Sequence, residues 1–151
     1  MLFKDPAKYL DYRKNLITQD EILVRLLDKI PVVKAMIIKE QEYYSPEIPG
    51  CYTLLGELAS IVVARVEEGD TSDFKTIFAE VERWHYYGDS YVREAATIGF
   101  LENLQNLLGH KELSQELIES WLGSRSLAWW ERLNRFWSGD VLALQYEEVI
   151  D

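Results

Sequence analysis

Apolar residues recur at three- and four-residue steps along most of this chain, which is the period of an amphipathic α-helix. The longest such run lies between Tyr52 and Glu68, where two apolar stripes predict a helix buried on two sides. The pattern predicts further helices beginning near Asp5, Thr18, Pro31, Ser72, Ser90, Lys111 and Leu127. Because alternating apolar and polar positions and hairpin turn pairs are absent, the predicted fold class is all-α.

Glycines follow most of these apolar stripes, at positions 69, 88, 109, 123 and 139. Glycine often ends a helix because it adopts the left-handed backbone conformation without a steric penalty. We therefore expect each of these glycines to cap a helix C-terminus. Helices of this length joined by short loops predict stacked antiparallel helices, either HEAT-like or in an irregular helical bundle.

The chain length of 151 residues fits a single domain, residues 1–151. The strongest loop signal is Ser45-Pro46-Glu47-Ile48-Pro49-Gly50. It leaves open an alternative in which residues 1–46 form an N-terminal helical arm and residues 47–151 form an acidic helical body.

The formal net charge is −10, and it is unevenly placed along the sequence. Residues 1–46 carry +1, whereas residues 47–151 carry −11. This balance disfavours nucleic acid as a partner, because binding to a phosphate backbone needs concentrated basic charge. No basic leader with an apolar run and no apolar stretch of about 20 residues is present. We therefore expect a cytoplasmic protein that does not bind a membrane.

The sequence offers few groups for catalysis or metal binding. A Glu-x-x-His spacing occurs once, at Glu82 and His85, whereas di-metal carboxylate bundles need two such pairs. The lone cysteine, Cys51, could pair with His85 or His110 as a nucleophile, but a small buried apolar role is favoured. Phosphate-binding and dinucleotide-binding glycine motifs are absent. The sequence therefore predicts no enzyme, no metal and no cofactor.

Acidic residues and tyrosines that the inward stripes do not use gather between residues 67 and 94. Acidic groups steer a basic partner, and tyrosines supply rigid contact area at binding sites. The candidate partner-binding residues are Glu67, Glu68, Asp70, Asp73, Glu80, Tyr86, Tyr87, Asp89, Tyr91 and Glu94. A solvated acidic surface without a partner is the alternative. In the most apolar predicted helix, Glu102 is expected to be a structural anchor, held by an ion pair or hydrogen bond between helices to a side chain such as Arg65, Arg83 or Arg93. Direct contact of Glu102 with a binding partner is the alternative.

The segment from Tyr52 to Asn106 carries the motifs Tyr52-Thr53-Leu54-Leu55-Gly56-Glu57-Leu58-Ala59 and Gly99-Phe100-Leu101-Glu102-Asn103-Leu104, with Gly88-Asp89 between them. This segment resembles the helical immunity proteins of bacterial contact-dependent growth inhibition and polymorphic toxin systems. The resemblance implies a non-enzymatic inhibitor that binds a cognate toxin domain, often a nuclease with a basic cleft. A helical adaptor with another protein partner is the alternative, and the oligomeric state stays open.

Overall fold

A computed structural model of the chain describes residues 16–43 and 50–145, and the helix predicted to begin near Asp5 lies outside them. The structure is all-α, as the apolar periodicity predicts, and the described residues form no β-strand. A single backbone bridge joins Ile17 to Gly88. The helices are α1 (Gln19–Lys29), α2 (Pro31–Tyr43), α3 (Cys51–Glu68), α4 (Phe74–Tyr87), α5 (Ser90–Glu94), η3 (Ala95–Leu101), α6 (Glu102–His110), α7 (Glu116–Glu119) and α8 (Ser124–Trp137).

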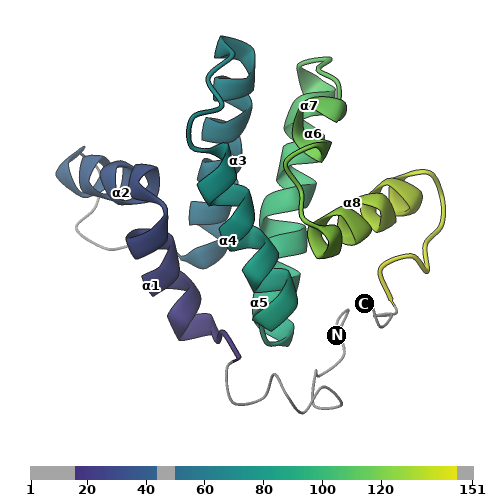
Figure 1. Ribbon diagram of the computed structural model, residues 1–151, viewed down its shortest axis with the longest axis horizontal. Helices are drawn as coiled ribbons and strands as arrows, with labels where there is room; N and C mark the ends of the chain where they lie inside the picture. Colours follow the sequence, from purple (N-terminus) through teal and green to yellow (C-terminus); the bar gives the residue numbers. More distant parts are fainter. Residues whose placement is uncertain (1–15, 44–49, 146–151) are drawn as a thin grey trace.

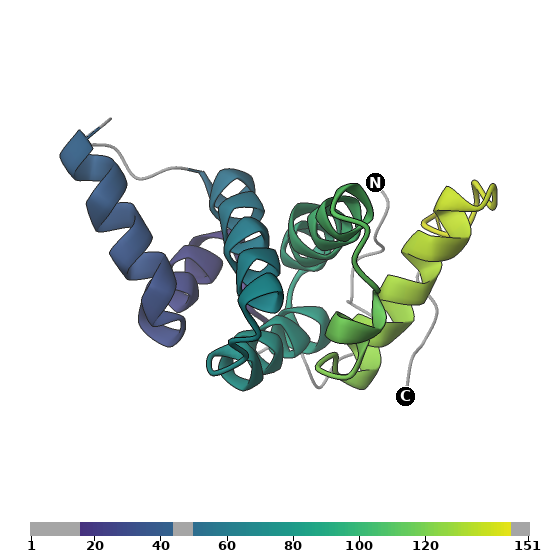
Figure 2. The same ribbon diagram turned by 90° about the horizontal axis from the view of Figure 1, so that it is seen from above.

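The helices pack side by side around one apolar core (Figure 1). The α1–α2 pair lies at one side of the molecule and α8 at the other, with α3 to α6 between them (Figures 1 and 2). Helix α3 packs against η3 and α6, and α4 packs against α8 and α1. The helix predicted over residues 52–68 is buried on two sides as expected, because Leu54 and Leu58 are buried together with Leu55, Ala59, Val62 and Val63, but Tyr52, predicted to face inward, is 38% exposed. The structure is therefore a packed helical bundle.

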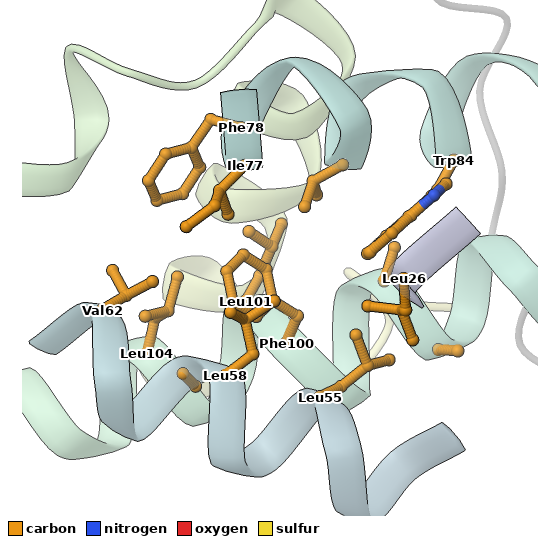
Figure 3. Close-up of a cluster of buried hydrophobic side chains, with 14 of the residues drawn as sticks. Leu26, Leu55, Leu58, Val62, Ile77, Phe78, Trp84, Phe100, Leu101 and Leu104 are labelled. Atoms are coloured by element: carbon orange, nitrogen blue, oxygen red, sulfur yellow. The ribbon is translucent and has the colours of Figure 1, made fainter. Parts of the chain in front are cut away.

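Side chains from five segments meet in the centre of this core. Figure 3 shows Leu26 of α1 beside Leu55 of α3 and Trp84 of α4, each with no more than 1% of its surface exposed. Removing such side chains from water contributes about 1.5–3 kcal/mol each for a large apolar group. The core therefore joins α1 to α3 and α4.

One helix runs without a break from Ser90 to His110, and its central part is a π-helix, η3. Asp89 caps the start of this helix, since its carboxylate accepts a hydrogen bond from the Val92 N–H at 2.9 Å. Gly99 lets η3 approach α3 closely, because a Cβ there would lie 3.1 Å from Leu55 and 3.2 Å from Tyr52. The periodicity predicts this helix but not its π-helical turn.

Two parts of the helix prediction are wrong. Gly69 caps α3 in the left-handed conformation (φ 74°), but Gly109 lies inside α6 and Gly123 precedes α8 as its N-cap. Of the helix predicted over residues 111–122, only α7 is helical. Glu112 has a positive φ of 55°, which interrupts the helical backbone near the predicted start. Among the described residues, no helix is long and apolar enough to span a bilayer.

Candidate functional site

The predicted binding residues divide between two ends of the molecule. Asp73 directly precedes α4, whereas Tyr86 and Tyr87 end it. A helix of 14 residues is about 21 Å long at a rise of about 1.5 Å per residue. We call Glu67, Glu68, Asp70 and Asp73 the acidic end, and Tyr52, Tyr86, Tyr87, Asp89, Tyr91 and Glu94 the tyrosine end. Apart from Tyr52, the sequence places these residues in one continuous cluster between residues 67 and 94, and the structure divides that cluster between the two ends of α4. Tyr52 is not among the predicted binding residues and joins the tyrosine end through its ring contact with Tyr91.

The acidic end comprises the last turn of α3, which carries Glu67 and Glu68, and the loop that leads from α3 to α4. Glu67 forms an ion pair with Lys111, which follows α6, and Asp73 forms an ion pair with Arg65 of α3. The Asp70 carboxylate accepts a hydrogen bond from the Ser72 N–H at 3.0 Å, and hydrogen bonds from Ser72 lower the pKa of Asp70. These contacts fix the position of the acidic end, while Glu67, Glu68 and Asp70 remain exposed.

The tyrosine end combines exposed and half-buried rings. The rings of Tyr86 and Tyr87 lie 4.6 Å apart, and the Arg125 guanidinium stands 4.5 Å from the centre of the Tyr86 ring. Tyr52 and Tyr91 meet edge to face at 6.0 Å. Tyr52 and Tyr87 each expose 38% of their surface, enough to offer a partner aromatic contact area.

The two acidic residues of this end act on different neighbours: Asp89 accepts a backbone hydrogen bond, and Glu94 lies near enough to Tyr52 to affect its pKa. Asp89 is half-buried and caps α5, so one of its oxygens is already engaged with the backbone. Burial and then the neighbouring charge of Glu94 raise the pKa of Tyr52 to about 12, so its hydroxyl stays protonated at neutral pH. Burial also raises the pKa of Tyr91, so the Tyr52–Tyr91 pair offers a partner aromatic surface rather than an anionic one.

Glu80 does not belong to either surface, although the sequence places it among the candidate binding residues. Only 1% of Glu80 is exposed, and its carboxylate accepts hydrogen bonds from Arg25 (2.8 Å), Arg83 (3.0 Å) and the Trp84 indole (3.1 Å). Position 80 lies on the face of α4 that packs against α1, so this carboxylate ties the two helices together. A count of acidic residues cannot distinguish such a buried anchor from a surface charge.

Glu102 is not the ion-paired anchor that the sequence predicts. It is half-buried, burial raises its pKa, and it forms no ion pair with Arg65, Arg83 or Arg93 in the described structure. A different carboxylate, that of Glu82 in α4, joins two helices. Its oxygens accept hydrogen bonds from the backbone N–H groups of Ser126 (2.8 Å) and Arg125 (3.1 Å) in α8.

Glu82 therefore caps α8 from another helix, where a negative charge also complements the helix dipole. A Cβ on Gly123 would lie 2.4 Å from the Glu82 carboxyl carbon, so glycine is required for this approach. Local sequence patterns do not reveal this contact, because 44 residues separate Glu82 from Ser126. The signal in the sequence is Gly123, which stands at the N-cap of α8 without a side chain of its own, so that another residue must cap this helix.

Cys51 and His85 do not form a catalytic pair. Burial raises the pKa of the Cys51 thiol to about 11, although a hydrogen bond with Tyr91 opposes this shift. His85 is buried, with Nδ1 2.8 Å from the Ser126 hydroxyl and Nε2 3.0 Å from the Thr97 hydroxyl. Both ring nitrogens are thus engaged by other side chains. Within the described ranges, no group of His, Cys, Asp and Glu side chains is arranged to hold a metal ion.

The fold and these surfaces define a helical bundle protein that presents one acidic and one aromatic end. The chain belongs to the family described as a domain of unknown function (DUF7674), whose model matches residues 23–138. That range runs from α1 to the residue after α8 and includes both ends. No curated protein and no solved structure matches the chain significantly.

Proposed function

We propose that this protein is an immunity protein that binds and neutralises a cognate bacterial toxin domain. The proposed target is a nuclease, and specifically an RNase. The acidic end of the immunity protein covers the basic cleft of this target. The structurally fixed carboxylates of the acidic end carry this proposal. The resemblance of residues 52–106 to immunity proteins supports the choice of a toxin as the partner.

Electrostatics favours a basic partner at the acidic end. The Glu67–Lys111 ion pair brings the turn after α6 beside the α3–α4 loop. Residues 65–73 and 111–119 together contain seven acidic and two basic residues. Clustered charge of one sign raises the association rate of an oppositely charged partner by about 10-fold to 1,000-fold, and salt suppresses the effect. A nuclease cleft that holds phosphates supplies the matching positive charge.

The tyrosine end lies within reach of the same partner. A standard interface buries about 800 Å² on each protein, which corresponds to a patch roughly 30 Å across. That patch is longer than α4, so one partner can contact both ends. Steering would then come from the acidic end, whereas Tyr52 and Tyr87 would supply the buried anchors that dominate binding energy.

Co-expression with a nuclease toxin domain encoded by an adjacent gene tests the function. Protection of the cells and co-purification of a complex are expected, and failure of both refutes the immunity function. A helical adaptor that binds another basic protein would also fail to protect the cells. Rates of association between this protein and the toxin domain, measured in low salt, then test whether the acidic end is the binding surface.

Two variants that change the net charge by the same amount make this test more specific. The first replaces the four acidic-end residues with lysine, and the second replaces four exposed acids elsewhere, Asp20, Asp28, Glu42 and Glu131. We expect the first variant to slow association by at least about 10-fold in low salt and the second to have a much smaller effect. Equal slowing by both variants would mean that net charge alone matters and that the acidic end is not the binding site.

A further inference from the structure

A groove along the outer side of α4 has positive charge, although the whole protein is acidic. It lies between α4 and residues 120–123, which lead into α8, and has a volume of about 350 Å³. Lys75 and Arg83 supply its two cations, and Trp121 and Leu122 supply apolar surface, whereas Phe78, which also lines the groove, is only 1% exposed. We call this feature the α4 groove.

The acidic residue of this groove is already engaged. Glu82 lines the groove, but both of its oxygens accept hydrogen bonds from backbone N–H groups at the start of α8. Arg83 contacts Glu80 through one guanidinium nitrogen, while 54% of its side chain remains exposed and can donate further hydrogen bonds. The acidic end stops two residues before Lys75, so the sign of the surface changes along α4.

The spacing of the groove residues matches an extended peptide. Lys75, Ala79 and Arg83 follow each other at four-residue steps on the exposed side of α4. The two cations are thus about 12 Å apart along the helix, at about 1.5 Å per residue. Four residues of an extended strand span about 13 Å, and alternate side chains of a strand point to the same side. Ala79 is small, so the groove stays open midway between the cations.

We infer that the α4 groove binds an extended acidic segment of a protein partner. The segment has two acidic residues four positions apart, which pair with Lys75 and Arg83. An apolar residue midway between them contacts Ala79 and Trp121. This inference does not rest on the immunity function, because it concerns a surface of opposite charge to the acidic end. The net charge of −10 disfavours a nucleic acid in the same groove.

Fluorescence anisotropy with a labelled synthetic peptide tests the inference. The peptide has two glutamates four positions apart with a leucine midway, and serine and glycine elsewhere. A matched peptide has glutamines in place of the glutamates. We expect the acidic peptide to bind with a Kd below roughly 1 mM and at least about 10-fold more tightly than its glutamine counterpart. Equal binding of the two peptides, or no binding of either, would overturn the inference.

Three variants locate the binding site. Lys75→Glu reverses a groove charge, Ala79→Trp fills the groove, and Lys34→Glu makes the same charge change on α2, where Lys34 is exposed. The two groove variants should weaken binding at least about 10-fold, and the α2 control should change it less than about 2-fold. Circular dichroism verifies that all three fold. Undiminished binding by Lys75→Glu, or displacement of the peptide by a single-stranded oligonucleotide that binds more tightly, would contradict the inference.

Discussion

Acidification should destabilise this protein through His85. The imidazole has 3% of its surface exposed and joins α4 to η3 and α8 through the hydroxyls of Thr97 and Ser126. Burial and, to a smaller extent, the charge of Arg93 lower the pKa of His85 from its ordinary 6.5 to about 3. The folded protein therefore keeps this ring neutral at pH values where the unfolded chain protonates it.

The size of the effect follows from the two pKa values. Because the folded pKa is the lower one, the unfolded state binds more protons, and stability is lost as the pH falls below 6.5 towards 3. The loss approaches about 1.4 kcal/mol per pH unit within this window and reaches about 2 kcal/mol at pH 5. Above pH 6.5, the pKa of His85 in the unfolded chain, the ring is neutral in both states. The free energy of unfolding should therefore change little through His85 between pH 7 and pH 8.

Urea unfolding followed by circular dichroism at pH 7 and pH 5 measures this loss. His85→Gln keeps a side chain that can hydrogen-bond to both hydroxyls but cannot take up a proton in this range. We expect the wild type to lose about 2 kcal/mol more between the two pH values than this variant does. His110→Gln, at an exposed position, should behave as the wild type. An equal loss in the wild type and His85→Gln would refute the reasoning.

Two further predictions concern buried contacts. Glu82→Ala removes two hydrogen bonds to the start of α8 and should lower the free energy of unfolding by about 2 kcal/mol, whereas Glu131→Ala at an exposed site of α8 should change it by less than about 0.5 kcal/mol. Equal urea midpoints for the two variants would contradict the capping role. Cys51 should react with a disulfide reagent at pH 8 at least about 100-fold more slowly in the folded protein than in urea, because a pKa of about 11 leaves little thiolate. Labelling at the same rate in both states would exclude this environment for the thiol.

The local pattern of the sequence predicts most helices because one amphipathic period fixes both the helix and its buried face. The stripes through Leu54 and Leu55 anticipate α3, and the cap at Asp89 anticipates the start of α5. The contacts between distant segments follow no such rule. His85 meets Ser126 across 41 residues, and the sequence alone does not specify which helices become neighbours.

The same limit explains why the predicted binding face divides into two surfaces. Proximity in sequence groups Asp73 with Tyr87, but the regular rise of the intervening helix carries them to opposite ends. The net charge also conceals a second surface, since the acidic end and the α4 groove differ in sign along one helix. A basic partner and an acidic segment would thus meet different parts of α4, and their simultaneous binding would fix the orientation of a partner that carries both.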